Sequence, residues 1–241
     1  MNCSKSVALI TGASRGLGLE IARTYAREGF IHGLILTARG AEALERAAHE
    51  LQKVTDVVAI PGDVGDQEHA ERLVAAGLRH FGRIDVLINN ASELGPSPMP
   101  ELAQLAASAF LDTLLVNVVA PLKLSQLVLP GMRARGCGLI VNVTSDAGVQ
   151  AYATWGGYGA SKAALEHLSR VLATELEGSG VRVYVVDPGD MDTAMHRAAE
   201  PGVDLSHLPN PNAVAPAFLR LLNEPAPFGR FEAQGLAAGA A

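Results

Sequence analysis

Short apolar runs alternate with amphipathic stretches along most of the chain, and this alternation restricts the fold more than any other feature. The stretches between the runs carry apolar residues at three- and four-residue spacing, which predicts helices. A strand–helix–strand repeat gives a parallel sheet covered by helices on both faces. We therefore predict an α/β fold, a doubly wound parallel sheet. The predicted strands are Ser6–Thr11, Leu34–Ala38, Val57–Ile60, Ile84–Ile88, Leu139–Val143 and Val181–Val186.

The predicted helices lie between these strands, and no shift in composition marks a second domain. With 241 residues, 49% of them hydrophobic, the chain can bury one core, so residues 1–241 are expected to form one domain. Pro121 should kink or split the longest helix. We expect a substrate loop at about 190–212 and a frayed tail at about 235–241. The predicted helices are Leu19–Gly29, Ala41–Lys53, Asp66–Phe81, Leu102–Arg133, most of Thr154–Leu172, and Ala213–Leu222.

A glycine-rich turn follows the first strand directly, with the spacing G-x-x-x-G-x-G. A strand, a glycine turn and a helix in this order aim the helix dipole and the first N–H groups of the helix at a phosphate. We interpret the turn as a site for the phosphates of a dinucleotide, and a tight turn without a ligand is the alternative. The residues of the turn are Gly12, Ser14, Arg15, Gly16, Leu17 and Gly18.

The end of the second strand bears on the choice of dinucleotide. An NAD-binding protein usually places Asp or Glu there, to hold the hydroxyls of the adenosine ribose. This chain has Thr37, Ala38 and Arg39 instead, with no carboxylate. Because a guanidinium matches phosphate geometry, Arg39 and Arg15 could pair with the 2′-phosphate of NADP(H). Two ordinary surface arginines are the alternative.

Tyr158 and Lys162 stand four residues apart in the helical stretch that follows the fifth strand, so their side chains share one face. A phenol with a pKa of about 10 is a poor acid or base at neutral pH. A neighbouring ammonium favours the phenolate and lowers the pKa of the phenol. The pair is a plausible acid–base device, although such spacing also arises by chance.

Polar residues follow the other predicted strands as well. In a doubly wound sheet, ligands bind at the carboxyl ends of the strands. The glycine turn, Arg39 and these polar residues should therefore meet at one edge of the sheet. The residues are Asp63, Asn90, Ser145 and Pro188.

Taken in order, these motifs resemble those of the short-chain dehydrogenase/reductase family, over about Val7–Met195. The family's pattern begins with T-G-x-x-x-G-x-G, here Thr11–Gly18, and continues with N-N-A-G, here Asn89–Ser92. A helical Asn, a Ser thirteen residues before the Tyr of Y-x-x-x-K, and a P-G with a Thr four residues after the Gly complete it. The resemblance implies a single-domain, Rossmann-type sheet with helices on both faces. The matching positions are Asn117, Ser145, Tyr158, Lys162, Pro188, Gly189 and Thr193.

The resemblance also implies a role for each residue. Tyr158 would exchange a proton with the substrate, Lys162 would lower the pKa of the phenol and hold the nicotinamide ribose, and Ser145 would polarise the carbonyl. Asn117 would hold a water-mediated proton relay. Read alone, Ser145 could be a turn residue and Asn117 a helix-kinking one. The implied cofactor-binding residues are Gly12, Ser14, Arg15, Gly16, Leu17, Gly18, Arg39, Asp63, Val64, Asn90, Ala91, Tyr158, Lys162, Pro188, Met191 and Thr193.

The chain departs from the family's pattern at two places. Ser92 replaces a glycine and would add a side chain where the backbone should pass close to the cofactor. The stretch Phe228–Gln234 is a poor match to the usual closing strand, which often supports a tetramer contact. We expect the first departure to shift cofactor affinity, and we expect the closing strand to be missing.

The substrate pocket should be formed by three segments, Glu93–Pro100, Asp146–Trp155 and Asp190–Pro211. They offer mostly apolar side chains and no cluster of cations, so we expect a small, mostly apolar carbonyl or alcohol. The implied substrate-binding residues are Ser145, Trp155 and Tyr158. Two stretches, Leu87–Gly95 and Pro188–Met195, are somewhat similar to those of sepiapterin-type and diketone reductases. The apolar pocket residues are Leu94, Met99, Trp155, Met191 and Met195.

Composition excludes several other functions. The net charge of −6 and the pI near 5.6 argue against binding to nucleic acid or to an acidic membrane surface. The histidines show no ligand spacing, so no metal site is predicted, and Cys3 and Cys137 form no disulfide framework, which suits the cytoplasm. The N-terminus has too few apolar residues for a signal peptide, and Leu111–Leu129 is interrupted by polar residues. The apolar residues of the helix containing Asn117 and of the Tyr158 helix exceed what one sheet face can cover, which favours a homodimer or homotetramer.

The leading hypothesis is an NADP(H)-dependent carbonyl reductase. NAD-linked alcohol oxidation is one alternative, against which Arg15 and Arg39 argue. A catalytically silent NADP(H)-binding sensor is another, although a sensor has no need of Ser145, Tyr158 and Lys162 together.

Overall fold

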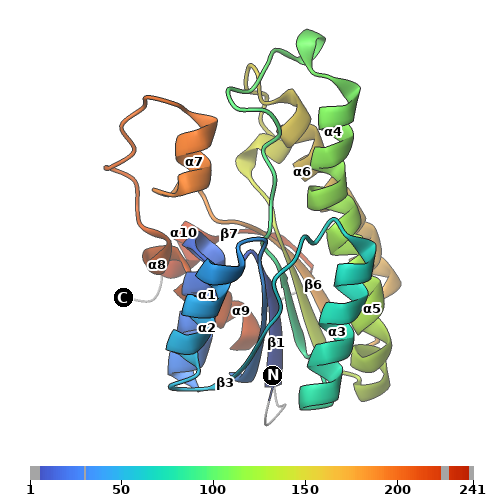
Figure 1. The fold of residues 1–241 in the computed structure, drawn as a ribbon. Coiled ribbons are helices and arrows are strands. Elements are labelled where there is room, and N and C mark those ends of the chain that lie inside the picture. The colour runs from blue at the N-terminus through green and yellow to red at the C-terminus, as the bar shows by residue number, and fades with distance from the viewer. Residues whose placement is uncertain (1–5, 30, 224–227, 239–241) are drawn as a thin grey trace.

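A parallel sheet forms the centre of the computed structural model, which describes residues 6–29, 31–223 and 228–238 (Figure 1). In the described residues the sheet has seven strands in the order β3-β2-β1-β4-β5-β6-β7, and each pairs in parallel with its neighbours. The predicted doubly wound sheet is confirmed. The strands are β1 Ser6–Thr11, β2 Ile31–Thr37, β3 Asp56–Ala59, β4 Val86–Asn89, β5 Gly138–Val143, β6 Val181–Asp187 and β7 Arg230–Glu232.

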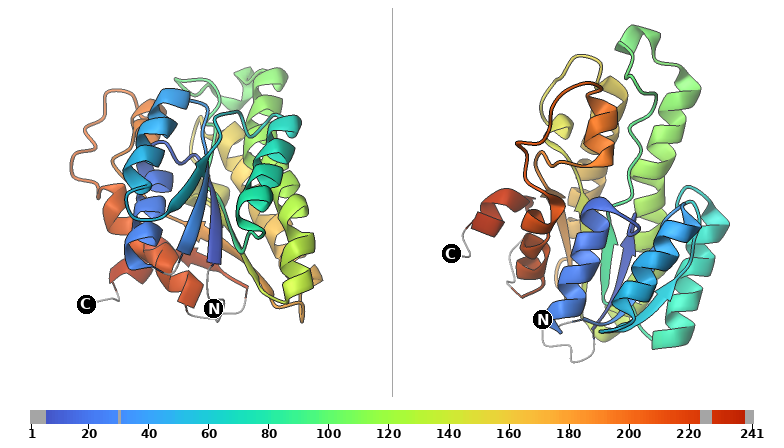
Figure 2. Two further views of the ribbon diagram at one scale, coloured as in Figure 1. Left: turned by 60° about the horizontal axis from the view of Figure 1, so that its bottom comes forward. Right: turned by 60° about the vertical axis from the view of Figure 1, so that its left-hand side comes forward.

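Helices cover both faces of the sheet, because successive strand residues point to opposite sides. In β1, Ala8 and Ile10 pack in one core with α1, α2, α8 and α9, whereas Val7 and Leu9 pack in a second core with α3 and α5 (Figures 1 and 2). The helices are α1 Gly16–Glu28, α2 Ala41–Leu51, α3 Gln67–Phe81, α4 Ala107–Leu114, α5 Ala120–Arg135, α6 Gly156–Glu175, α7 Ala194–Ala199, α8 Pro211–Val214, α9 Pro216–Asn223 and α10 Ala233–Ala238.

The longest predicted helix, Leu102–Arg133, is divided in the structure. A 3₁₀ turn at Leu102–Gln104 is followed by α4, by a π-helical turn at Leu115–Val119, and by α5. Pro121 explains the wide turn, because its ring would clash with the carbonyl four residues earlier, that of Asn117. Pro121 therefore perturbs the helix without ending it.

Of the described helices, only the run Ala107–Arg135 has the length and hydropathy of a membrane span. The side chains of Leu124, Val128 and Met132 are buried in the core that covers β4 and β5. We therefore interpret it as one of the layers of this fold.

The C-terminal region differs most from the prediction. Phe228–Gln234, which was expected to lack a closing strand, contains β7, and β7 pairs with the end of β6 from Val185↔Arg230 to Asp187↔Glu232. The predicted helix Ala213–Leu222 is split into α8 and α9 at Pro216. The tail, predicted to fray from residue 235, is helical through Ala238 in α10, and residues 239–241 lie outside the described residues.

Candidate active site

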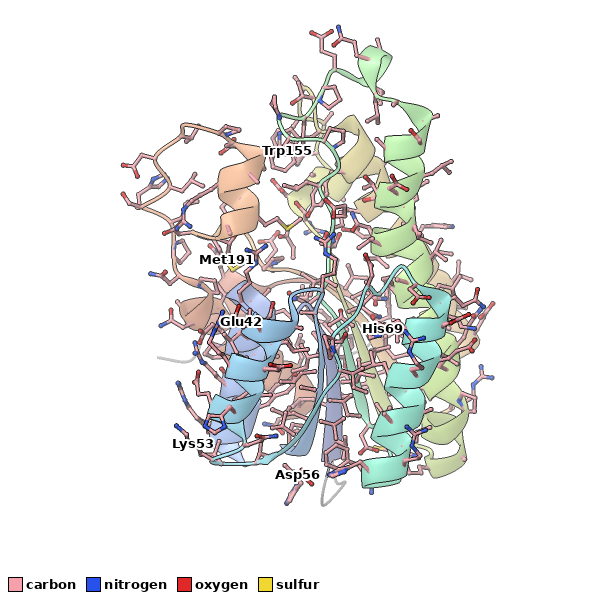
Figure 3. All side chains as sticks on the ribbon, viewed as in Figure 1. Glu42, Lys53, Asp56, His69, Trp155 and Met191 are labelled. Carbon is pink, nitrogen blue, oxygen red and sulfur yellow. The ribbon has the colours of Figure 1, made fainter. Side chains whose placement is uncertain are left out.

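A cavity of about 1070 Å³ runs along the carboxyl ends of the strands. Trp155, before α6, and Met191, after β6, both lie beyond these strand ends (Figure 3). The cavity brings together almost all of the predicted site residues, but Gly18, Asn117 and Met99 do not line it. Those that line it are Gly12, Ser14, Arg15, Gly16, Leu17, Arg39, Asp63, Val64, Asn90, Ala91, Leu94, Ser145, Trp155, Tyr158, Lys162, Pro188, Gly189, Met191, Thr193 and Met195.

The glycine turn between β1 and α1 forms one end of the cavity. Gly12 has a φ of +66°, and an added Cβ there would lie 3.0 Å from the Cα of Ala91. A Cβ at Gly18 would lie 2.5 Å from the carbonyl oxygen of Gly12, so both positions require glycine for close packing. No side chain caps the start of α1, and its first turn carries no acidic residue. These features fit the phosphates of a dinucleotide.

Arg39, which follows β2, reaches across the cavity to the loop after β4. Its Nη1 lies 3.1 Å from Oε2 of Glu93, and 65% of the Arg39 side chain is exposed. The guanidinium is therefore exposed in the cavity beside the end of β2. Glu93 was predicted only as part of a pocket segment. Its contact with Arg39 has no local signal in the sequence, because the two residues are 54 positions apart.

A buried histidine on α3 contacts the end of β2. His69 of α3 contacts the Oγ1 of Thr37 through Nε2 at 2.8 Å, and its Nδ1 has no hydrogen-bond partner. Burial lowers the pKa of His69, with a smaller contribution from Arg72. Asp63 accepts a hydrogen bond of 2.8 Å from the Gly65 N–H in the same region.

Tyr158 and Lys162 lie together on α6, as predicted. The Nζ of Lys162 lies 5.4 Å from the centroid of the Tyr158 ring and donates a hydrogen bond of 2.9 Å to the Val143 carbonyl at the end of β5. Both side chains are buried. The pair is thus placed where β5 and α6 meet the cavity.

Burial dominates the acid–base behaviour of this pair. It raises the pKa of Tyr158 to about 12, and the nearby hydroxyls of Ser92 and Ser145 only partly oppose it. It lowers the pKa of Lys162 to about 8, against the opposing charges of Asp187 and Glu166. The expectation that Lys162 lowers the pKa of Tyr158 below its ordinary value is therefore not met in the protein alone, where burial raises that pKa.

Ser145 lies at the end of β5 and faces a carboxylate. Its hydroxyl donates to Oδ1 of Asp146 at 2.9 Å, and Tyr152 donates to Oδ2 of Asp146 at 2.6 Å. Burial would raise the pKa of Asp146, but the hydroxyls of Tyr152 and Ser145 outweigh it and hold that pKa below its usual value. Asp146 was predicted only as part of a pocket segment, although it directly follows Ser145.

An aromatic row continues from this point along the cavity. The ring centroids of Tyr152 and Trp155 are 5.9 Å apart, and those of Trp155 and Tyr158 are also 5.9 Å apart. The row gives this side of the cavity an aromatic wall near the Ser145 hydroxyl.

Asn117 lies behind the cavity wall in the π-helical turn, and its side chain is fully engaged. Its Nδ2 donates to the Glu93 carbonyl at 2.8 Å and to the Ser161 hydroxyl at 2.9 Å. Its Oδ1 accepts from the Glu93 N–H at 2.8 Å and from the Ser92 hydroxyl at 3.1 Å. Asn117 thus holds the loop after β4, and Ser92 links Asn117 to the neighbourhood of the Tyr158 phenol.

The segment after β6 closes the cavity. Thr193 accepts a hydrogen bond of 3.1 Å from the His196 N–H and caps α7, and Met191 is buried beneath it. Asp190 is an exposed loop carboxylate, whereas Asp192 pairs with Arg197.

Comparison with known proteins agrees with this geometry. The family model described as short chain dehydrogenase matches residues 6–204. The 2-(R)-hydroxypropyl-CoM dehydrogenase of Xanthobacter autotrophicus is 36% identical over 190 residues, which cover 78% of this chain and 76% of the relative.

Solved structures with bound cofactor are also similar. An alcohol dehydrogenase from the archaeon Thermococcus sibiricus, complexed with 5-hydroxy-NADP, has 31% identity and a TM-score of 0.83, with 95% of this chain and 96% of that chain covered. A metagenomic short-chain oxidoreductase in complex with NADP has 31% identity and a TM-score of 0.78, with the same coverage, 95% and 96%. From its sequence motifs, its sheet and these matches, the chain belongs to the short-chain dehydrogenase/reductase family of oxidoreductases.

Proposed function

We propose that the protein is an NADPH-dependent reductase that converts a carbonyl of a small, mostly apolar substrate to an alcohol. The observation that carries this proposal is the placement of the Tyr158 phenol in the same cavity as the Ser145 hydroxyl, with the Nζ of Lys162 5.4 Å from the centroid of the Tyr158 ring. Burial raises the pKa of Tyr158 to about 12, so the phenol is protonated at neutral pH and can donate a proton to the alkoxide that forms during reduction.

The roles of the side chains follow from the chemistry of reduction. A bound reduced nicotinamide supplies a hydride, and negative charge then develops on the carbonyl oxygen of the substrate. The Tyr158 hydroxyl donates its proton to that oxygen, while the Ser145 hydroxyl turns from Asp146 to stabilise it. The ammonium of Lys162, 5.4 Å from the ring centroid, stabilises the phenolate that remains.

The choice of NADP(H) over NAD(H) rests on the adenosine end of the cavity. Arg39 is exposed there, and Ala38 stands where a ribose-binding carboxylate would be expected. Two of the similar solved structures carry NADP or 5-hydroxy-NADP, which supports the same choice. The glycine turn would hold the linking phosphates.

The proposed substrate class rests on the apolar side chains that line the cavity. They are Tyr152, Trp155, Leu94, Met191 and Met195. These side chains suit a small ketone or aldehyde with an apolar body, its carbonyl oxygen placed between Ser145 and Tyr158.

We also propose that the protein is a homo-oligomer built on the helical run Ala107–Arg135. Leu111, Leu115 and Val119 follow one another at four-residue spacing, and their exposed fractions are 63%, 41% and 49%. Such a stripe on one side of a helix is typical of a surface that a second copy covers.

A panel of carbonyl compounds, followed by NADPH absorbance, tests the proposed reaction. We expect several apolar ketones or aldehydes to be reduced with NADPH much faster than with NADH. Turnover of alcohols with NAD⁺ but not with NADP⁺ would favour the NAD-linked dehydrogenase. Tight NADPH binding with no turnover across the panel would favour a sensor.

A further inference from the structure

Three charged side chains form a cluster of ion pairs near Lys162, and one of them, Asp187, also lines the cavity. Glu166 lies one helical turn after Lys162 on α6, and Asp187 ends β6. Arg230, on β7, bridges the two carboxylates: its Nε lies 3.1 Å from Oε1 of Glu166, and its Nη2 lies 2.6 Å from Oδ2 of Asp187. The closing strand thus brings a cation to the base of the active site.

The carboxylates of this group are held from further directions. The Thr144 hydroxyl, at the end of β5, donates to Oε1 of Glu166 at 2.8 Å, and the Gly189 N–H donates to Oδ1 of Asp187 at 2.9 Å. Only 8% of each carboxylate side chain is exposed. The group is therefore rigid and poorly hydrated, which strengthens the electric effect of its charges on neighbouring groups.

We infer that Arg230, Glu166 and Asp187 form a charge-balancing network that sets the protonation state of Lys162 and so positions the acid–base pair at Tyr158. The catalytic role of the network rests on the proposed function, but the network itself is present in the protein without cofactor. With Lys162 protonated, the four side chains carry two positive and two negative charges. None of the three touches the predicted reacting atoms, so they are positioning residues.

The direction of each contribution follows from elementary electrostatics. Burial lowers the pKa of Lys162 to about 8, and the charges of Asp187 and Glu166 act in the opposite direction. Arg230 carries a charge of the same sign as Lys162, so it offsets part of the effect by which the two carboxylates raise the pKa of Lys162. Removing a carboxylate should therefore lower the pKa of Lys162 further, and removing Arg230 should raise it.

Other ionisable groups also act on the network and on the pair, and the exposed Glu232 of β7 lies 3.8 Å from Nη1 of Arg230. Tyr158 lies on the same helix, and the charges of Asp187 and Asp146 act on it in the direction that raises its pKa. Asp146, from the segment after β5, is itself within the electrostatic reach of Arg230. The network thus acts on both members of the acid–base pair, and most directly on Lys162.

The test follows the titration of Lys162 without requiring turnover. The chain has only four lysines, Lys5, Lys53, Lys123 and Lys162, so ¹³C labelling at lysine Cε gives few NMR signals, and a Lys162→Arg variant assigns the one of interest. We expect a wild-type midpoint near pH 8. In Glu166→Gln, an isosteric change that can still accept from Arg230, the midpoint should fall by about one pH unit.

The sign of this shift separates electrostatics from loosened structure. A loosened site would hydrate Lys162 and raise its midpoint toward the ordinary value, so an unchanged or raised midpoint in Glu166→Gln would overturn the inference. Arg230→Gln should raise the midpoint, and Arg230→Lys, which keeps the charge, should leave it near wild type. Glu175→Gln removes an exposed carboxylate from the same helix and should have no effect.

Kinetics then connect the network with the proposed reaction. If carbonyl reduction is observed, the alkaline limb of the kcat profile in Glu166→Gln should move to lower pH by the same amount as the NMR midpoint. A moved midpoint without any carbonyl reduction would leave the network standing and refute the proposed function. Carbonyl reduction together with an unchanged Lys162 midpoint in Glu166→Gln would support the proposed function and refute the network.

Discussion

Replacing Tyr158 with Phe isolates the proposed proton donor, because the change removes one hydroxyl and keeps the ring. The ring is buried and packs edge-on against Trp155, with centroids 5.9 Å apart, and Phe preserves this contact. The hydroxyls near the phenol keep their other partners, since Ser92 donates to Asn117 at 3.1 Å and Ser145 donates to Asp146 at 2.9 Å. We therefore expect the free energy of unfolding to change by less than about 1 kcal/mol.

The effect on turnover should be far larger than the effect on stability. Without Tyr158 the developing alkoxide has no neutral acid beside it, and a positioned general acid contributes roughly 10²–10⁴-fold to the rate. We expect kcat to fall by about 10³-fold, equivalent to about 4 kcal/mol of activation free energy. NADPH affinity should change by less than about threefold, because Lys162 keeps its hydrogen bond to the Val143 carbonyl.

The assay combines NADPH absorbance for turnover with NADPH fluorescence for binding, on wild type and two companion variants. Ser145→Ala should lower kcat by about 10²–10³-fold with little effect on NADPH binding. Lys162→Ala should lower kcat and weaken NADPH binding, because the same ammonium would stabilise the phenolate and hold the nicotinamide ribose. If Tyr158→Phe reduces the best carbonyl substrate as fast as wild type, Tyr158 is not the proton donor and the reasoning from its buried phenol fails.

Three further predictions concern other parts of the molecule. Arg39→Asp should weaken NADPH binding by on the order of 2 kcal/mol, because water screens the charge at this exposed site, and it should leave NADH binding nearly unchanged. Equal losses of affinity for both cofactors in a fluorescence titration would contradict this prediction. Because burial lowers the pKa of His69 below its unfolded value of about 6.5, its contribution to stability is present above that pH and is lost as the pH falls below it. The free energy of unfolding, measured with urea at pH 7 and at pH 5, should therefore fall more for wild type than for His69→Gln. Leu115→Glu should convert the oligomer to monomers in sedimentation velocity at micromolar concentration, whereas the exposed change Val54→Glu should not; an oligomeric Leu115→Glu protein would place the interface elsewhere.

The strands and the glycine turn could be predicted because their signals are local. Apolar runs between turn residues identify buried parallel strands, and the N–H groups at the start of α1 follow from a strand, a turn and a helix in sequence order. The common edge of the sheet then brings Gly12, Arg39, Ser145 and Tyr158 together, although they are far apart in the chain. Topology alone accounts for that part of the site.

The remaining features depend on contacts that no local pattern carries. Glu93 meets Arg39 across 54 positions of sequence, and Arg230 meets Glu166 across 64. The strand β7 has only three residues, too few for a periodic signal, and it is defined by its pairing with β6. The pKa of Tyr158 was predicted from its neighbour in sequence, but burial, which depends on the whole fold, determines its direction.

The closing strand and the active site depend on each other. As an edge strand of three residues, β7 contributes few backbone hydrogen bonds, and the ion pairs of Arg230 at 3.1 and 2.6 Å add contacts to α6 and to the end of β6. These same contacts place a cation behind Lys162. Any change that shifts β7 must therefore alter the charge balance around Lys162, and any change in that balance must alter the free energy that holds β7 on the sheet.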